Sequence, residues 1–294
     1  MCNFSFEVFP PRKDENIKNL HAILDDLGQL SPNFISVTFG AGGSINSQNT
    51  LEVASLIQEE YQIPSIVHLP CIHSSKEKIT QILQKCKEKN LNQILALRGD
   101  ICENLEKSKD FSYASDLISF IKKQEYFEIY AACYPEKHNE SKNFIEDIHH
   151  LKTKVNAGTD KLITQLFYDN EDFYTFKQNC ALAGIDIPIY AGIMPITNKR
   201  QVLKISQLCG AKIPPKFVKI LEKYENNALA LEDAGIAYAC DQIVDLITSG
   251  VDGIHLYTMN KSKAAIKIYE AVKHLLKEDV RGILKRTCNY PKLF

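Results

Sequence analysis

Short stretches rich in β-branched and aromatic residues alternate along the chain with longer stretches in which apolar residues recur every three or four positions. The short stretches are typical of buried strands, and the longer ones are typical of helices that cover one face of a sheet. The pattern predicts strands at residues 3–9, 34–39, 65–69, 93–97, 128–133, 161–167, 187–193 and 253–257.

The stretches between the strands predict amphipathic helices. Gly158, Gly184 and Gly250 stand where a helix should end before the next strand, because glycine readily takes the left-handed conformation that terminates helices. The clearest helical patterns cover residues 17–30, 49–61, 76–90, 113–123, 141–157 and 172–183.

Strands that alternate with helices favour a parallel sheet covered by helices, and no Pro- or Ser-rich linker divides the chain. We therefore expect an α/β fold in which one (β/α)8 TIM barrel spans residues 1–278, followed by a C-terminal tail at 279–294. The segment before the last strand is longer than one unit requires. It predicts one or two extra helices, within 199–209 and 229–249, and Pro214 and Pro215 start a short helix between them.

An open, doubly wound sheet is the alternative fold. That fold places a glycine-rich turn after its first strand, whereas here the first strand runs into Pro10 and Pro11. The glycine-rich turn at 40–43 follows the second strand instead and lacks the third spaced glycine of a dinucleotide fingerprint. These features favour the barrel.

Composition narrows the class of protein. With 294 residues, 45% hydrophobic and 24% charged, the chain can bury a large core without disulfides or metal. The nine cysteines, an odd number with no C-x-x-C pair, favour a reducing compartment, so we expect a cytoplasmic location. His68, Cys71 and His73 lie close together but lack a second ligand pair, and we expect no metal site.

Charge and hydropathy bear on partners. The net charge is -1 and basic residues are scattered, which predicts no nucleic-acid partner. No apolar run approaches the ~20 residues of a membrane span, and residues 1–12 lack the basic and apolar regions of a signal peptide. We therefore expect small-molecule ligands, with neither nucleic acid nor a membrane as partner.

Polar residues stand at the predicted carboxyl ends of seven of the eight strands. In a barrel these ends and the loops after them form the active site. Polar side chains on such apolar flanks are costly to desolvate, and a shared site for a large polar ligand accounts for them. They are Glu7, Thr38, His68, Arg98 with Asp100, Tyr134, Gln165, and Tyr257 with Asn260.

A set of strings, in chain order, matches one enzyme family. They are FSFEVFPPR (4–12), FISVTFGAGGS (34–44), ALRGD (96–100), YASDL (113–117), YPEKH (134–138), ITQLFYD (163–169), GIMPITN (192–198) and HLYTMN (255–260). On these strings the chain resembles methylenetetrahydrofolate reductase, over nearly the whole catalytic domain. It resembles the compact bacterial type, which has no C-terminal regulatory domain.

The resemblance implies a flavin-dependent NAD(P)H oxidoreductase. Members bind FAD without covalent attachment and take a hydride from NADH or NADPH. They pass it to 5,10-methylenetetrahydrofolate and form 5-methyltetrahydrofolate, in one-carbon metabolism and methionine biosynthesis. The family is usually oligomeric, which implies a homo-oligomer. The sequence leaves the preference between NADH and NADPH open, and it carries no diagnostic interface.

The resemblance assigns catalytic roles to Glu7 and Asp100. Glu7 matches the glutamate that protonates the amine nitrogen released when the folate ring opens. With an unshifted pKa of about 4.3, roughly one Glu7 in 500 would be protonated at pH 7, so its surroundings must raise the pKa. Phe4, Phe6 and Phe9 could supply apolar walls, although alternation puts only some of them on its side of the sheet.

Asp100 matches an aspartate beside the flavin pyrimidine and the folate pterin, where a negative charge tunes the flavin potential. Without the motif, Arg98 and Asp100 would be interpreted as an ordinary surface ion pair.

The resemblance also implies binding residues. The cofactor set is Thr38, His68, Arg98, Gly99, Asp100, Ala114, Tyr134, His138, Ser141, Asp147, His150, Thr153 and Lys154. The folate set is Asp100, Gln165, Gln201 and Lys261. Lys154 suits the pyrophosphate, whereas His150 and Thr153 replace the usual amide and arginine. Lys261 stands where an arginine is common. A lysine can attract a carboxylate but cannot bind it with two parallel hydrogen bonds as arginine does. Ile205 stands where some members have an aromatic residue, and plain helix-face roles stay open for Gln201 and Ile205.

Three other functions compete with the reductase. A flavin barrel acting on another substrate, such as a proline dehydrogenase-like enzyme, would explain the flavin contacts but not Gln165 together with Glu7. A Schiff-base aldolase is disfavoured because the sixth strand ends in Gln165 rather than a lysine. A non-catalytic folate- or flavin-binding protein would not need Glu7 and Asp100 together.

Overall fold

The strands close into one parallel barrel in a computed structural model that describes residues 2–11, 17–39, 47–102 and 104–277. β1 pairs with both β2 and β8, so the sheet has no open edge and the doubly wound alternative is wrong. The strands are β1 (Asn3–Val8), β2 (Ile35–Val37), β3 (Ser65–Pro70), β4 (Gln93–Leu97), β5 (Glu128–Cys133), β6 (Lys161–Thr164), β7 (Ile189–Ile193) and β8 (Gly253–Tyr257). The predicted TIM barrel is confirmed.

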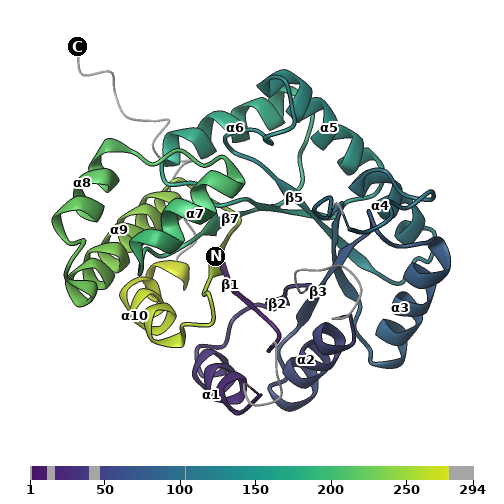
Figure 1. The fold of residues 1–294 in the computed structure, drawn as a ribbon, viewed down its shortest axis with the longest axis horizontal. Coiled ribbons are helices and arrows are strands. Elements are labelled where there is room, and N and C mark those ends of the chain that lie inside the picture. The colour runs from purple at the N-terminus through teal and green to yellow at the C-terminus, as the bar shows by residue number, and fades with distance from the viewer. Residues whose placement is uncertain (1, 12–16, 40–46, 103, 278–294) are drawn as a thin grey trace.

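Helices surround the barrel (Figure 1). Three of them separate β7 from β8, which confirms the prediction of extra helices before the last strand. Gly158, Gly184 and Gly250 all have positive φ and end helices as predicted. The helices are α1 (Ile17–Gly28), α2 (Ser47–Glu60), α3 (Lys76–Glu88), α4 (Ala114–Lys122), α5 (Phe144–Asn156), α6 (Asn170–Leu182), α7 (Lys199–Cys209), α8 (Pro215–Lys223), α9 (Ala228–Thr248) and α10 (Ser262–Val272), followed by the short 3₁₀ helix η2 (Leu275–Lys277).

Some predicted boundaries are wrong, for local reasons. Helix α5 begins three residues later than predicted because the Asn143 side chain caps it by accepting a hydrogen bond from the backbone N–H of Glu146. Helix α6 begins two residues earlier than predicted because Asp169 caps it. Strand β6 ends at Thr164 rather than at residue 167, because Leu166 and Tyr168 turn aside to pack in the cluster beneath α7 and α8.

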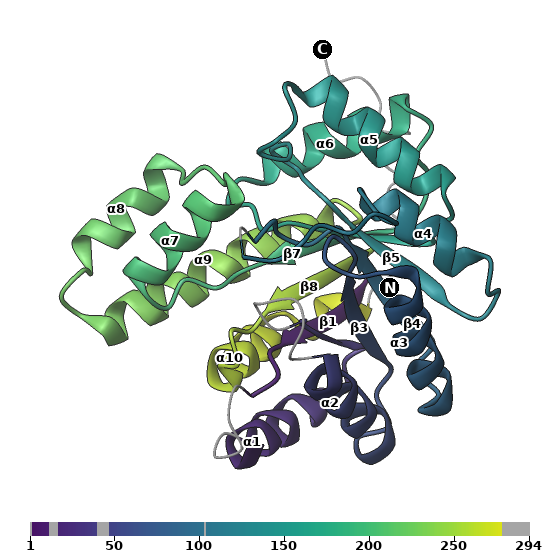
Figure 2. The same cartoon turned by 45° about the vertical axis from the view of Figure 1, so that its right-hand side comes forward.

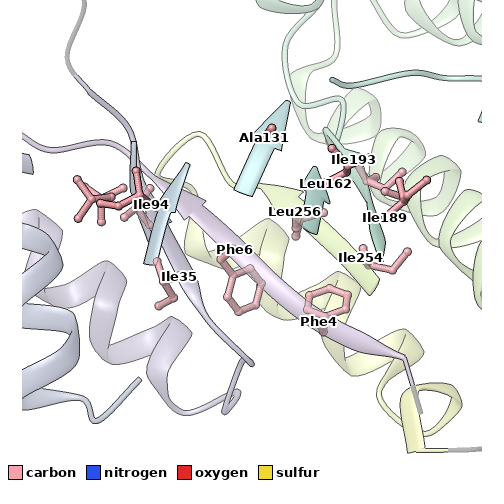
Figure 3. Close-up of a cluster of buried hydrophobic side chains, with 14 of the residues drawn as sticks. Phe4, Phe6, Ile35, Ile94, Ala131, Leu162, Ile189, Ile193, Ile254 and Leu256 are labelled. Carbon is pink, nitrogen blue, oxygen red and sulfur yellow. The ribbon is translucent and has the colours of Figure 1, made fainter. Parts of the chain in front are cut away.

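Two apolar regions hold the barrel together. Phe4 and Phe6 point outward into the layer between strands and helices (Figure 3). There Phe4 packs edge-on against Tyr269 of α10, with ring centroids 5.5 Å apart. Inside the barrel, a separate cluster fills one end with large side chains. It comprises Phe34, Ile66, Leu95, Tyr130, Ile163 and Tyr190. This inner cluster closes the amino-terminal end, so the opposite end is where a ligand can enter.

Helices α7 and α8 stand to one side of the barrel (Figure 2). They have a small core of their own, in which Phe217 of α8 packs against Tyr168, and Met194 and Ile196 join it from the segment after β7. This core lies beyond the ends of β6 and β7 and extends one wall of the barrel mouth.

No helix in the described part of the chain is long and apolar enough to cross a membrane. The glycine-rich turn at 40–43 and the predicted tail at 279–294 lie outside the described residues.

Candidate active site

A cavity of ≈330 Å³ opens at the carboxyl end of the barrel. Polar residues from six strand ends line it, namely Glu7, Thr38, His68, Tyr134, Gln165 and Tyr257. The structure therefore brings together residues that are as far apart in sequence as 7 and 257. Apolar side chains, among them Leu97, Met194 and Ile205, form much of the remaining wall.

The Glu7 carboxyl is almost enclosed in this cavity, with 12% of its side chain exposed. No described residue donates a hydrogen bond to it, and His68 Nε2 lies 3.6 Å from Oε2. Burial raises the pKa of Glu7 to about 8. At that value roughly nine in ten Glu7 side chains are protonated at pH 7.

The apolar walls around Glu7 differ from those expected. Of the three neighbouring phenylalanines only Phe9 lines the cavity, whereas Phe4 and Phe6 face the helices. The larger apolar contribution comes from distant strands, through side chains such as Leu97 and Met194.

His68 lies opposite Glu7 and is also buried. Burial lowers the pKa of His68 to about 3, so the imidazole is neutral at physiological pH. Its Nε2 has no hydrogen-bond partner among the described residues. A buried, unpartnered ring nitrogen next to a protonated carboxyl can accept a hydrogen bond from that acid, or one from a ligand in the cavity.

A polar network that was not predicted from the sequence lies inside the barrel, one layer of side chains below the mouth residues. His255 is fully buried, with Nδ1 2.8 Å from Ser5 Oγ and Nε2 3.2 Å from Ser36 Oγ. Ser5 Oγ donates to the carbonyl of Ile254, so His255 Nδ1 carries the proton and Nε2 accepts from Ser36. Burial lowers the pKa of His255 to about 3. The signal was present in the sequence, because each of these residues precedes a mouth residue by two positions.

A second and a third cavity, of ≈460 Å³ and ≈320 Å³, continue from the mouth along the ends of β4 and β5. Leu97, Arg98, Tyr134 and His138 line both, so the two form one long groove. The groove gathers the whole predicted cofactor set except Thr38, which lines the central cavity only. Ala114, Ser141, Asp147, His150, Thr153 and Lys154 line its larger part, and His68, Gly99 and Asp100 its smaller part.

Arg98 does not pair with Asp100, so the ordinary ion pair considered from the sequence is not present. Its guanidinium instead grips Glu140 with two hydrogen bonds, of 2.5 and 2.7 Å. Glu140 holds the pKa of Arg98 above its usual value. Glu140 could not be predicted from the sequence, because its partner is 42 residues away and because the YPEKH string ends two residues before it.

Gly99 allows the Asp100 loop to lie close to β3. Its φ is +86°, and a Cβ there would lie 2.8 Å from Pro70 Cβ, so only glycine fits without movement. The exposed Asp100 carboxylate consequently stands at the edge of the smaller cavity.

The other end of the groove carries two charged residues, Asp147 and Lys154. Asp147 is buried and accepts a hydrogen bond of 2.8 Å from Ser141 Oγ. Lys154 Nζ donates to the carbonyl of Ala132 at 2.5 Å and lies 5.7 Å from the centre of the Tyr134 ring. Burial lowers the pKa of Lys154 because it destabilises the charged ammonium, and an anion bound beside it would stabilise that charge.

The predicted folate residues are less tightly grouped. Gln165 lines the central cavity, and its Oε1 accepts a hydrogen bond from the backbone N–H of Leu166. Gln201 lines none of the three cavities, but Ile205, one turn along α7, does. Lys261 is exposed and donates to Thr197 Oγ1 at 2.7 Å.

His73, considered above beside His68 and Cys71, holds the loops after β3 and β4 together. Its Nε2 accepts from the backbone N–H of Cys102 at 3.1 Å, and Nδ1 lies 2.9 Å from the carbonyl oxygen of Glu106. Both ring nitrogens are therefore engaged in backbone contacts, whereas His68 faces the mouth.

Comparison with known proteins identifies one family. The family model described as methylenetetrahydrofolate reductase matches residues 1–273. The chain is 34% identical to the 5,10-methylenetetrahydrofolate reductase of Escherichia coli, over 90% of this chain and 89% of that one. It is 36% identical to methylenetetrahydrofolate reductase (NADH) 1 of Arabidopsis thaliana, over 90% of this chain, but it spans only 47% of that longer relative.

A solved structure supports the fold. An uncharacterised protein from Clostridium thermocellum superposes with a TM-score of 0.63, covering 93% of this chain and 95% of that one, at 14% identity. That protein is described as binding two copies of 5-methyl-5,6,7,8-tetrahydrofolic acid. At this identity the likeness shows the shared barrel fold and no more.

Proposed function

The chain belongs to the methylenetetrahydrofolate reductase family, and from this premise we propose that it reduces 5,10-methylenetetrahydrofolate to 5-methyltetrahydrofolate, with FAD as bound cofactor and NADH or NADPH as hydride donor. The observation that carries the proposal is the Glu7 carboxyl. It is kept protonated by burial, and it shares the mouth of the barrel with Gln165 and adjoins the groove at Tyr134. The reaction needs one proton at neutral pH, and this acid can supply it.

The groove fits FAD in size and charge. Its two parts, of ≈460 and ≈320 Å³, lie within the range of small-molecule sites and together suit an elongated ligand. Arg98 already binds a carboxylate there with two hydrogen bonds, so its guanidinium has the geometry that an anion requires. Lys154 supplies a second cation at the far end.

Different residues along the groove would contact different parts of the cofactor. Arg98, His138 and Lys154 would hold the anionic part, while His150 and Thr153 lie at the open end, where the adenine would lie. His68, Gly99 and Asp100 would surround the flavin ring, and Thr38 would approach it from the central cavity. When bound there, FAD would supply the hydride chemistry that links the nicotinamide to the folate.

Glu7 acts as the acid of the folate half-reaction. Opening the five-membered ring releases an amine nitrogen, which takes the Glu7 proton, and the carboxylate left behind regains a proton from solvent. The apolar walls make that carboxylate costly, so the proton returns readily. The unpartnered Nε2 of neutral His68 can accept the Glu7 O–H and orient it.

The substrate side of the mouth is built from four parts of the fold. Gln165 and Asp100 would bind the pterin, with Gln165 from the end of β6 and Asp100 from the loop after β4. Gln201 and Ile205 share one face of α7, and Lys261 stands at the start of α10, where its ammonium would attract the glutamate tail of the folate. Ile205 offers an apolar surface without aromatic stacking.

An anaerobic absorbance experiment tests the proposal. The purified protein, reconstituted with FAD, should be yellow, bleach when NADH or NADPH is added, and recover its colour when methylenetetrahydrofolate follows. Protein that stays colourless after reconstitution contradicts the cofactor assignment. Protein that bleaches but is not reoxidised by the folate contradicts the substrate assignment and favours a flavin barrel with another substrate.

We further propose that the protein acts in the cytoplasm as a homo-oligomer, in one-carbon metabolism and methionine biosynthesis. The cysteine content and the resemblance support this placement. Gel filtration with light scattering measures the oligomeric state directly.

A further inference from the structure

The carboxyl end of helix α7 is tied to the loop after β5, although α7 follows β7 and strand β6 lies between. Asn139 Nδ2 donates to the carbonyl of Leu208 at 3.0 Å, and the backbone N–H of Lys212 donates to Glu136 Oε2 at 2.9 Å. We call these four residues, together with Gly210, which lies between Leu208 and Lys212 in the chain, the α7 latch.

Gly210 makes the close approach possible. It ends α7 with a φ of +74°, and a Cβ there would lie 1.9 Å from Asn139 Oδ1. The same residue therefore terminates the helix and leaves room for the asparagine that holds it.

Glu136 is the buried half of the latch. Only 7% of its side chain is exposed, and Lys212 Nζ lies 3.9 Å from the same carboxylate. Among the described residues its Oε1 has no hydrogen-bond partner. A buried carboxylate with so few partners depends on the two Lys212 groups, so moving the chain after α7 away would cost it both contacts.

The two elements that the latch joins both contribute to the walls of the site. The loop after β5 begins at Tyr134 and contains His138, and both line the cofactor groove. Helix α7 presents Ile205 to the central cavity and Gln201 on the same face one turn earlier. The latch passes beyond the end of β6, where Gln165 stands.

We propose that Asn139 and Glu136 are positioning residues that hold α7 against the loop after β5 and so set the width of the mouth for the folate and the nicotinamide. The substrate part of this inference rests on the proposed function; the structural part does not. Neither residue lines the three cavities, so both act through α7.

Hydrogen exchange tests the structural part. In the FAD-reconstituted protein, Asn139→Ala should speed amide exchange in the second half of α7 about five- to tenfold, as expected for the loss of one hydrogen bond. Glu136→Ala should do the same. Lys142→Ala is the matched control, since Lys142 lies in the same loop, is 86% exposed, and pairs only with Glu146 of its own segment. Wild-type exchange in α7 of both latch variants would overturn the inference.

Steady-state kinetics tests the substrate part. Both latch variants should raise KM for methylenetetrahydrofolate and for the nicotinamide about five- to tenfold, with kcat within twofold of wild type and full flavin content. Faster exchange with unchanged KM values would show that α7 does not shape the mouth and would overturn the inference. A wild-type protein that reduces no folate would refute the proposed function instead, and the exchange data would still decide the latch.

Discussion

Glu7 shows how much of a site's chemistry depends on one residue's surroundings. The side chain is an ordinary glutamate, and the FSFEVFPPR string around it does not indicate whether its carboxyl is protonated. Its pKa of about 8 comes from burial among side chains of other strands, opposite a His68 that burial keeps neutral. The sequence could indicate which residue is the acid. The apolar walls of its cavity, which include Leu97, Met194 and Ile205, come from distant parts of the chain.

Replacing Glu7 by Gln should separate the two half-reactions. The amide keeps the shape of the carboxyl but has no acidic proton, so folate turnover should fall by about 10² to 10⁴, the usual contribution of a general acid. Flavin content and bleaching by NADH or NADPH should be close to wild type. Stopped-flow absorbance measures both half-reactions, and an equal loss in both would mean that Glu7 has a structural role.

The same residue should make stability depend on pH. The folded pKa is about 8 and the ordinary value is 4.5, so between these pH values the folded state binds a proton that the unfolded state has released. Stability therefore falls as pH rises through this window, by roughly 1.4 kcal/mol per pH unit. His68 and His255, whose pKa values are lowered from 6.5 to about 3, destabilise the fold as pH falls below 6.5.

Urea unfolding of the wild type and of Glu7→Gln between pH 6.5 and 8 isolates the Glu7 effect, because the histidines contribute equally to both proteins. Across this range the free energy of unfolding should fall by about 1.6 kcal/mol more in the wild type than in Glu7→Gln, and this extra drop is the Glu7 effect. Glu222→Gln, at an exposed position on α8, is the control and should keep it. A Glu7→Gln protein with the wild-type slope would refute the raised pKa.

At the scale of elements, the sequence predicted strands better than the contacts they make. The runs at 93–97, 128–133 and 253–257 match β4, β5 and β8 at both ends, because they are continuous apolar runs with clear breaks. Strand β6 was overextended because Leu166 and Tyr168 are as apolar as a strand requires but pack with α7 and α8. Helix α10 was not located, although its apolar spacing was visible.

Tertiary contacts of the loops could not be predicted from the sequence. Glu140 is unremarkable in the sequence, and only the fold shows that it neutralises Arg98 in the cofactor groove. Likewise, the link between Asn139 and Leu208 joins the loop after β5 to the last turn of helix α7. Such pairs depend on tertiary placement rather than on local pattern.

Glu140→Gln should strengthen FAD binding. The Glu140 carboxylate occupies the anion site of Arg98 and adds a negative charge where the cofactor is anionic, so its neutralisation should lower the Kd for FAD severalfold. The Lys142→Ala variant, in the same loop, should leave the Kd unchanged. Quenching of flavin fluorescence measures both, and weaker FAD binding by Glu140→Gln would show that the Arg98–Glu140 pair supports the site.

At the scale of the whole molecule, closure of the barrel is what assembles the site. The first and last strands pair, so Glu7 lies beside Tyr257 in register. Beyond the strands the seam continues, because the Asn260 side chain accepts from the backbone N–H of Phe9 at 2.8 Å and donates to its carbonyl at 3.0 Å. Two segments that lie 251 residues apart in the sequence are therefore joined at the mouth.

Asn260→Ala should loosen this seam. Two hydrogen bonds are lost, and Asn260 has a φ of +54°, a conformation that asparagine tolerates better than alanine, so we expect a loss of about 1–3 kcal/mol in unfolding free energy. Asn260→Asp keeps the acceptor and should lose less. Urea denaturation measures both, and an unchanged midpoint for Asn260→Ala would show that the seam is held by the strands alone.

The account depends on an acid at position 7 that is protonated near neutrality and delivers its proton to the folate. The most direct measurement is the rate at which methylenetetrahydrofolate reoxidises the reduced protein, followed anaerobically by stopped-flow absorbance from pH 6 to pH 9.5. The account predicts a constant rate at low pH that falls above about pH 8, approaching tenfold per pH unit, as Glu7 loses its proton. A rate that rises or stays constant through that range would contradict it.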